Sequence, residues 1–300
     1  MNSFTCNATN KNKTQTVKAY AKINFTLDIT GKLPNGYHTV NMVMQSVNLQ
    51  DTLTLNITDT GITIKSNWDF IPTDSSNTVY KAAAEFFAYT NITGGVNVKV
   101  EKNIPAQAGL AGGSADAAAV LIGLNSLYKA NLPLNELALL GAKVGADVPF
   151  CLYGGTKLAT GTGTDLHTVN GNFNSYTVLL CKPNIGVSTK EAYDLSDARP
   201  YTKVVHSTIF LKYFAQNNLA GMGNSLYNDF DELLTLELVE HIKSIIKQSG
   251  GYASMSGSGP TAFGLFANPT DAKNCAQILK KIYKDTFITQ PVNYGCKIIL

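Results

Sequence analysis

A glycine-rich segment, Pro105–Ala115, has the residue types best suited to chemistry in this sequence. It reads PAQAGLAGGSA and leads into an alanine-rich run that continues to about Tyr128. Glycines let a backbone approach a ligand closely, and a helix start presents unpaired N–H groups with partial positive charge. The segment therefore predicts an anion site of main-chain donors, with Ser114 placed to cap the helix. The alternative is an ordinary glycine-rich turn, and the spacing matches neither a Walker A loop nor G-x-G-x-x-G.

A lysine and an aspartate elsewhere in the chain could together activate a hydroxyl group. Apolar and polar residues alternate from Val17 to Thr30, which predicts a half-buried strand with Lys22 and Asn24 side by side on its polar face. Asp147, in GADVPF, could accept a proton from a hydroxyl nucleophile, and Lys22 could offset developing charge. Each also has a plain structural interpretation, because an Asp near Pro often braces a turn and an outward Lys is usually solvated.

Tyr37 and His38 follow a predicted Asn-Gly turn and could offer a stacking face and a hydrogen-bonding edge to a flat base. A packing pair in a hairpin is the alternative. A second glycine loop, Met255–Pro260, could be another backbone nest or a simple hairpin loop. Neither glycine loop has the form G-x-S-x-G of an α/β-hydrolase, and the remaining histidines show no metal-ligand spacing.

Composition restricts which ligands and compartments fit these segments. The 300 residues carry 24 Lys+Arg and 21 Asp+Glu, and the net charge of +3 is too small to indicate nucleic-acid binding. Arg199 is the only arginine, so a phosphate would have to be held by main-chain N–H groups, lysines or a metal. Five scattered cysteines predict reduced thiols in a cytoplasmic protein, and no apolar run approaches the ~18–20 residues of a membrane span. The polar residues 1–16 lack a secretory signal and are expected to form a disordered tail.

The order of predicted elements indicates an α+β fold. Strands are expected over 17–30, 38–49, 96–100, 176–182, 251–255, 261–266 and 292–300, with a further hairpin made by 53–57 and 62–65. Helices are expected from a cap at 75–77 to about 87, and over 114–128, 135–144, 207–220, 235–248 and 270–283. Residues 150–163 are expected to be strand and glycine turns, and 183–206 a loop. We place a domain boundary near residue 160, which gives domains 17–160 and 161–300.

Taken together, these segments resemble the three motifs of the GHMP kinase superfamily, in order and at suitable separations. The resemblance rests on AKINFTLDITGKLPNGYH, IPAQAGLAGGSADAAA, GADVPFCLYGGT, KPNIGVSTKEAY and MSGSGPTAFGLF, and runs from about residue 17 to the C-terminus. It implies two α+β domains, an N-terminal nucleotide-binding domain and a ferredoxin-like C-terminal domain, with ATP and substrate in the cleft between them. Ala111 and Ala115 stand where many relatives have Gly and Ser, which makes the turn at Ala111 less permissive.

The resemblance also implies roles for the matching residues. Asp147 would be the base that deprotonates the substrate hydroxyl, and Lys22 would orient it and stabilise charge. Ser114 would lie near the phosphates and Mg²⁺. The ATP phosphate loop would comprise Pro105, Ala106, Gln107, Ala108, Gly109, Leu110, Ala111, Gly112, Gly113, Ser114 and Ala115, with Asn77 and Lys102 on the nucleoside side. The substrate side would comprise Asn24, His38, which reads the polar edge of a cytosine, and Tyr37 and Tyr193, which sandwich its ring.

These roles describe a kinase that moves the γ-phosphoryl group of ATP to the 2-hydroxyl of a cytidyl diphosphate ester in isoprenoid precursor synthesis. One alternative is a kinase of the same superfamily for homoserine, mevalonate or a related alcohol, which the aromatic residues argue against. Others are a non-catalytic nucleotide sensor and a serine hydrolase that uses Ser114. We expect a small-molecule substrate, no nucleic acid, no membrane and no obligate protein partner.

Overall fold

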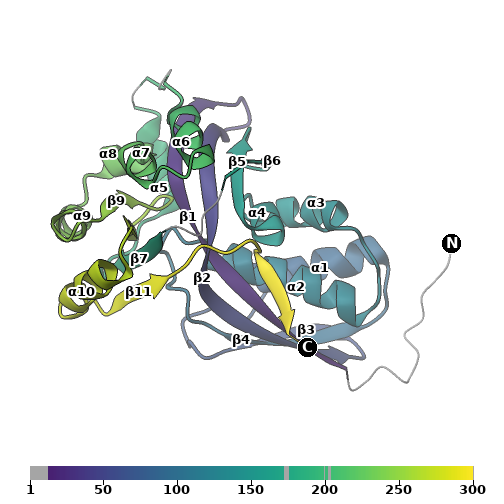
Figure 1. Cartoon of the computed structure of the whole chain (residues 1–300). Helices are drawn as coiled ribbons and strands as arrows, with labels where there is room; N and C mark the ends of the chain where they lie inside the picture. Colours follow the sequence, from purple (N-terminus) through teal and green to yellow (C-terminus); the bar gives the residue numbers. More distant parts are fainter. Residues whose placement is uncertain (1–12, 172–175, 199, 202–203, 300) are drawn as a thin grey trace.

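Two long antiparallel strands form the backbone of the molecule. The computed structural model describes residues 13–171, 176–198, 200–201 and 204–299. In Figure 1, β1 (Thr14–Lys32) and β2 (His38–Thr58) run from the lower edge of the molecule to its upper end. Residues 1–12 of the expected tail lie outside the described residues, whereas residues 14–16 already belong to β1. Within the described ranges, no helix combines the length and the apolar character needed to cross a bilayer.

Strand β1 confirms the predicted alternation, but both of its faces are covered. The helices α2 (Gly112–Leu127) and α6 (His206–Ala215) pack on it. As a result Lys22 is only 4% exposed and Asn24 is fully buried, so the solvated interpretation of Lys22 is wrong. The pairing of β1 with β2 contains three register shifts, which bend the hairpin.

The predicted second hairpin is not formed. Strand β2 continues to Thr58, and β3 (Gly61–Ser66) pairs in parallel with β4 (Gly95–Glu101), which lies between β2 and β3. All three valines of β4 are buried, whereas Ile64 is the single buried residue of β3, so the more apolar strand takes the inner place. The parallel pairing needs a crossover, and the helix α1 (Thr78–Thr90) provides it.

Three helices follow β4. Besides α2, these are α3 (Leu134–Val144) and α4 (Val148–Tyr153). The expectation of a strand from residue 150 is wrong, because VPFCLY forms the helix α4 with Pro149 in its first turn. A short apolar run fits a buried helix as well as a buried strand, and Pro is favoured at a helix start. The strands β5 (Thr156–Thr160) and β6 (Asp165–Thr168) then pair with each other, and β5 also pairs with β2.

The helix α2 begins earlier than expected. Gly112 is its first residue and Ala111 is the N-cap, with a left-handed backbone at φ 58° and no side-chain cap. Ser114 is therefore the third helical residue and does not cap, which corrects the prediction. The first turn of α2 keeps its N–H groups without a capping side chain, which matters for what it can bind.

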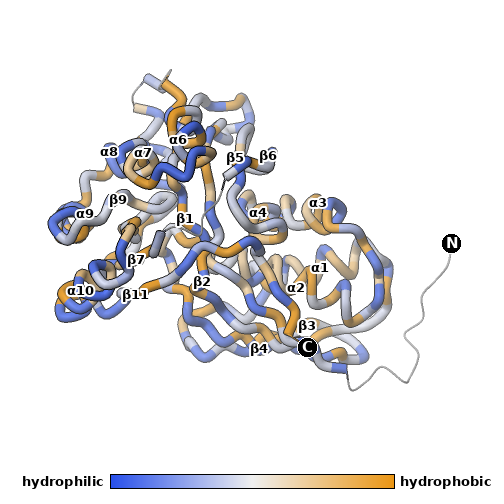
Figure 2. The backbone as a smooth tube through the Cα atoms, viewed as in Figure 1, coloured by the Kyte–Doolittle hydropathy of each residue, from blue (hydrophilic) through white to orange (hydrophobic). Residues whose placement is uncertain are grey.

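A second, four-stranded antiparallel sheet has the order β11-β7-β10-β9. The first of these strands in the chain, β7, therefore lies between the last, β11, and the third, β10. This order confirms a ferredoxin-like C-terminal unit. Its strands are β7 (Thr177–Lys182), β9 (Tyr252–Met255), β10 (Ala262–Phe266) and β11 (Asp285–Thr289). The helices that pack on it are α9 (Glu237–Gln248) and α10 (Pro269–Lys280). Both helices carry hydrophilic residues at the outer left of Figure 2.

Short elements connect β7 to α9. They are α5 (Thr189–Ser196), α6, α7 (Leu219–Asn224), β8 (Tyr227–Asn228) and α8 (Asp229–Leu234). The helix α5 lies where a loop was expected. The chain also crosses the predicted boundary at residue 160, because β6 and the last strand, β12 (Cys296–Ile299), both pair within the first sheet. The division into 17–160 and 161–300 stays a prediction.

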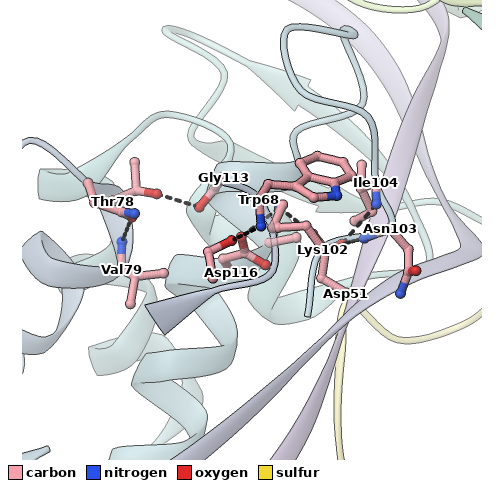
Figure 3. A network of polar contacts seen from close by, with 12 residues as sticks. Asp51, Trp68, Thr78, Val79, Lys102, Asn103, Ile104, Gly113 and Asp116 are labelled. Carbon is pink, nitrogen blue, oxygen red and sulfur yellow. Dashed lines mark hydrogen bonds and ion pairs between the residues drawn. The ribbon is translucent and has the colours of Figure 1, made fainter. Parts of the chain in front are cut away.

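A buried ion network ties the start of α2 to the first sheet (Figure 3). The Nζ atom of Lys102 contacts Asp51 and, at 2.7 Å, the Oδ2 atom of Asp116. The other oxygen of Asp51 accepts from the main-chain N–H groups of Asn103 and Ile104, at 2.5 and 2.8 Å. None of the three charged side chains is more than 6% exposed. Burial disfavours the charged form of Lys102, but the two neighbouring aspartates have the larger effect and raise the pKa of Lys102. Burial also raises the pKa of Asp116.

Replacing Lys102→Met should leave two buried carboxylates without a cation. We expect the free energy of unfolding to fall by about 3–5 kcal/mol in a denaturant titration. Lys99→Met is the matched control, because Lys99 is 62% exposed and its ion-pair partner in the described part of the chain is the exposed Glu101. It should change stability by less than about 1 kcal/mol. Equal losses in the two variants would contradict a structural role for the network.

Replacing Ala111→Gly should stabilise the protein. A left-handed conformation costs an alanine about 1–2 kcal/mol, part of which is offset because glycine has a freer unfolded chain. We expect a net gain of about 0.5–1 kcal/mol in the same titration. Ala118→Gly makes the same change in the buried interior of α2 and should lose at least about 1 kcal/mol. A loss of stability in Ala111→Gly would show that this turn is not strained.

Candidate functional site

A cavity of about 420 Å³ lies where the two sheets' loops meet. The first half of the chain contributes Lys22, Asn24, Asp147 and the segment 104–113 to its wall. The second half contributes Thr189 and Tyr193 of α5, Phe230 of α8 and the loop at 257–258. A concave site of this size, built from several elements, is typical of small-molecule binding.

The glycine-rich segment lines the cavity with its main chain. The carbonyl groups of three successive residues, 108–110, are bonded to other segments: to Thr261 N at 3.3 Å, Ser256 Oγ at 3.0 Å and Lys22 N at 3.2 Å. Among the hydrogen bonds between described residues, none is donated by the N–H groups of residues 107–113. Free donors at a helix start favour a phosphate. The structure thus supports the anion-site interpretation over an ordinary turn.

Close approach to the second glycine loop fixes the shape of this segment. A Cβ atom on Gly109 would lie 2.0 Å from the carbonyl oxygen of Ser256, and the residue has φ +73°, so only glycine fits. The second loop joins the antiparallel strands β9 and β10, which confirms the hairpin interpretation. Its residues Gly257 and Ser258 also line the cavity. The hairpin loop between β9 and β10 therefore packs directly against the glycine-rich segment that precedes α2.

Lys22 and Asp147 lie together at the cavity, as predicted. Their Nζ and Oδ2 atoms are 3.8 Å apart, and Lys22 also donates to Asn24 Oδ1 at 2.7 Å. Asp147 makes no capping hydrogen bond at the start of α4, and its side chain is 31% exposed, so it can reach a ligand. A lysine beside a carboxylate near a phosphate site can orient a hydroxyl group and offset charge on a transferred phosphoryl group.

The residues expected on the ATP side differ in whether their polar atoms are available to a ligand. Asn77 caps α1, accepting from Val79 N at 2.8 Å and donating to the carbonyl of Pro72 at 2.5 Å. Lys102 lines the cavity, but its ammonium group is held by the two aspartates. Ser114 is not among the lining residues and lies beside Gly145. Within the described ranges, no group of three His, Cys, Asp or Glu side chains could hold a metal ion.

The residues expected on the substrate side are only partly brought together. The ring of His38 stacks on Tyr193, with centroids 4.7 Å apart and an interplanar angle of 23°. Phe230 meets Tyr193 edge-on at 4.9 Å. Tyr37 is 64% exposed and makes no ring contact with the other described residues, so no sandwich with Tyr193 is formed. The ring that packs against Tyr193 is therefore His38, and Tyr37 lies apart from it.

Sequence reasoning missed several residues of the site. Asp116 is a lone carboxylate in the alanine-rich run, and a charge among apolar residues could have marked it. Thr189 and Ser258 both line the cavity, and their hydroxyl oxygens are 3.0 Å apart, within hydrogen-bond distance. The helix that carries Thr189 begins with the capping pattern S-x-x-E, in which Ser188 accepts from Glu191 N at 3.3 Å. That pattern was a local signal for α5.

Comparisons with known proteins agree with this geometry. Residues 77–155 match the family model for the GHMP kinases N terminal domain, and residues 210–285 match GHMP kinases C terminal. Over 280 residues the chain is 43% identical to the 4-diphosphocytidyl-2-C-methyl-D-erythritol kinase of Clostridium tetani (strain Massachusetts / E88). The match covers 92% of this chain and 99% of that protein. The kinase of the same name from Clostridium novyi (strain NT) is 39% identical over 278 residues, with the same coverage.

Solved structures point the same way. A crystal structure of a 4-(cytidine 5'-diphospho)-2C-methyl-D-erythritol kinase aligns with TM-score 0.78 and 26% identity, over 92% of this chain and 98% of the other. A homoserine kinase from Cytophaga hutchinsonii also aligns with TM-score 0.78, over 99% and 100% of the chains, but at 20% identity it shows the fold alone. The chain belongs to the GHMP kinase family, in the group formed by the 4-diphosphocytidyl-2-C-methyl-D-erythritol kinases.

Proposed function

We propose that this kinase transfers the γ-phosphoryl group of ATP to the 2-hydroxyl of 4-diphosphocytidyl-2-C-methyl-D-erythritol, giving the 2-phosphate and ADP. The observation that carries the proposal is the run of unbonded N–H groups at 107–113, which shares a cavity with Lys22 and Asp147. Relatives at 39–43% identity, matched over almost their whole length, bear the name of this activity.

In the proposed reaction the triphosphate lies on the main chain of 107–113, where the start of α2 adds its partial positive charge. The substrate hydroxyl lies at Asp147, which takes its proton as the new O–P bond forms and the bond to the β-phosphate breaks. Lys22, held in place by Asn24, stabilises the charge that develops on the transferred group. Phosphoryl transfer needs this positioning and charge stabilisation more than covalent catalysis.

Mg²⁺ fits the donors at this site. Mg²⁺ is usually bound through one or two protein oxygens together with substrate phosphates and water, so a cluster of three ligands is not required. We assign two oxygen donors that would hold the ion: Asp147, which lines the cavity, and Ser114, in the first turn of α2. When bound, the ion would neutralise charge on the phosphates.

The remaining assignments follow from position. Asn77 and Lys102 would contact the nucleoside of ATP through their main chain and the carbon atoms of their side chains, because their polar ends are already hydrogen-bonded. Tyr193 would stack on the cytosine, His38 would read its edge, and Tyr37 would cover it from its exposed place in the hairpin turn. The cytoplasm stays the proposed location, and a small molecule the proposed partner. A homoserine or mevalonate substrate has support only from likeness in fold.

Release of ADP, measured in a coupled assay with ATP and Mg²⁺, tests the proposed substrate. The protein is given 4-diphosphocytidyl-2-C-methyl-D-erythritol and, in parallel, homoserine and mevalonate. We expect turnover only with the cytidyl substrate. Turnover with one of the other alcohols would replace the substrate assignment, and silence with all three, together with measurable ATP binding, would favour a nucleotide sensor.

Asp147→Asn tests the proposed base. The variant keeps the shape of the side chain but cannot take a proton, so kcat should fall at least about a hundredfold. The KM for ATP should stay within a small factor, because the phosphate loop is unchanged. Asp271→Asn is the matched control, since Asp271 lies exposed in the first turn of α10, and it should leave kcat unchanged. Near-normal kcat in Asp147→Asn would refute the assignment.

A further inference from the structure

A polar cluster lies at the turn that joins β1 to β2 and borders the cavity through Tyr193. We call it the Asp197 cluster; its members are Lys32, His38, Tyr193, Asp197 and Tyr201. Lys32 and His38 are cross-strand neighbours at the ends of β1 and β2. Tyr193 and Asp197 are four residues apart at the end of α5, so they lie on one side of that helix. The cluster therefore joins the hairpin of the first sheet to a helix of the second half of the chain.

Asp197 is the centre of this cluster. Its Oδ1 atom lies 2.7 Å from His38 Nε2 and accepts from the hydroxyl group of Tyr201 at 3.0 Å. Its other oxygen accepts from the ammonium group of Lys32. The hydrogen bonds from Lys32 and His38 lower the pKa of Asp197, so the group is a carboxylate throughout the physiological range. A carboxylate has no proton to donate.

The place of Asp197 in the fold points to a role outside its own helix. It occupies the C-cap of α5, where the partial negative charge of the helix end disfavours a carboxylate. An aspartate is better suited to the first turn of a helix than to the last. The contacts with Lys32 and His38 compensate for this position.

These contacts decide which nitrogen of His38 carries a proton. Because Asp197 can only accept, the Nε2 atom must be protonated. In the neutral ring Nδ1 is then an acceptor, and the structure shows no partner for it among the described residues. The ring has little freedom to turn over, because the His38 side chain is only 7% exposed and contacts two rings. It stacks on Tyr193, and its centroid lies 6.5 Å from that of Tyr201, with the two planes at 67°.

A hydrogen-bond acceptor at this point distinguishes the two pyrimidines. Cytosine carries an exocyclic amine, which donates, where uracil carries a carbonyl oxygen, which accepts. A site built to pair with one polar group rejects a ligand that offers the opposite one. We propose that Asp197 selects cytosine over uracil by holding His38 as the Nε2–H tautomer, which leaves Nδ1 to accept from the exocyclic amine. This inference rests on the proposed function, which puts a cytosine at Tyr193.

The tautomer can be measured without any substrate. In protein labelled with ¹⁵N, two-bond imidazole correlations report which nitrogen of each of the four histidines is protonated. The signal of His38 is the one lost in His38→Gln. We expect a protonated Nε2 and an unprotonated Nδ1 in the neutral ring, and a mixture of tautomers in Asp197→Leu. A His38 ring protonated at Nδ1 in the unaltered protein would overturn the proposal.

Kinetics test the selection itself. The readout is kcat/KM for 4-diphosphocytidyl-2-C-methyl-D-erythritol divided by kcat/KM for its uridyl counterpart. In Asp197→Leu we expect the KM of the cytidyl substrate to rise about 10–100-fold and the ratio to fall at least about tenfold. The KM for ATP should not change, because the phosphate loop lies elsewhere. Asp197→Glu, which restores a carboxylate, should recover part of the ratio.

A matched control is available on the same helix. Asp194 is 57% exposed and, among the described residues, its ion pair is with Lys190, so Asp194→Leu should leave the ratio unchanged. If the cytidyl compound is the substrate but Asp197→Leu keeps the full ratio, the selection by Asp197 is wrong while the proposed function stands. If the protein phosphorylates homoserine or mevalonate instead, the proposed function fails and the selection of a base fails with it, whatever the tautomer of His38.

Discussion

The structure depends on keeping the N–H groups of residues 107–113 unbonded. Unpaired main-chain groups inside a protein are costly, so hydrogen bonds to the carbonyl groups of this segment have to fix its conformation. Two neighbouring segments donate hydrogen bonds to its carbonyl groups, namely the strand β1, through Lys22, and the loop between β9 and β10, through Ser256 and Thr261. Because these partners come from both halves of the chain, the anion site exists only when the two sheets are assembled.

Buried positive charge is divided between two lysines with different surroundings. Lys102 is enclosed by two carboxylates under the start of α2 and serves the fold. Lys22 lies on the neighbouring wall, with an amide at 2.7 Å and a single carboxylate at 3.8 Å, and remains available to a ligand. The sole arginine, Arg199, lies outside the described residues, so the described site handles anions with main-chain donors and lysine.

The substrate side is built differently from the phosphate side. One short helix, α5, presents Thr189, Tyr193 and Asp197 at intervals of four residues, and the β1–β2 turn supplies His38. Contacts between side chains, rather than main-chain geometry, hold these groups. A site of this kind can change its ligand by exchanging a few side chains while the phosphate loop is kept, which fits the spread of substrates among proteins of this fold.

Local patterns in the sequence were sufficient for several features. Alternation predicted β1 and the contact of Lys22 with Asn24, the glycines before the alanine-rich run predicted the anion site, and Asn77 was among the expected caps of α1. These features depend on residues close in the chain, where strand and helix periodicity apply directly. The motifs, by their residues and order alone, also indicated the family.

Other features were decided only by the tertiary structure. The insertion of β4 between β2 and β3, the helical form of 148–153 and the return of β12 to the first sheet depend on which apolar surfaces meet. The ammonium group of Lys102 is directed to Asp51 and Asp116, 51 and 14 residues away, and His38 rather than Tyr37 packs on Tyr193. The physical reason is the same in each case: burial and charge pairing are set by partners distant in sequence, which no local periodicity encodes.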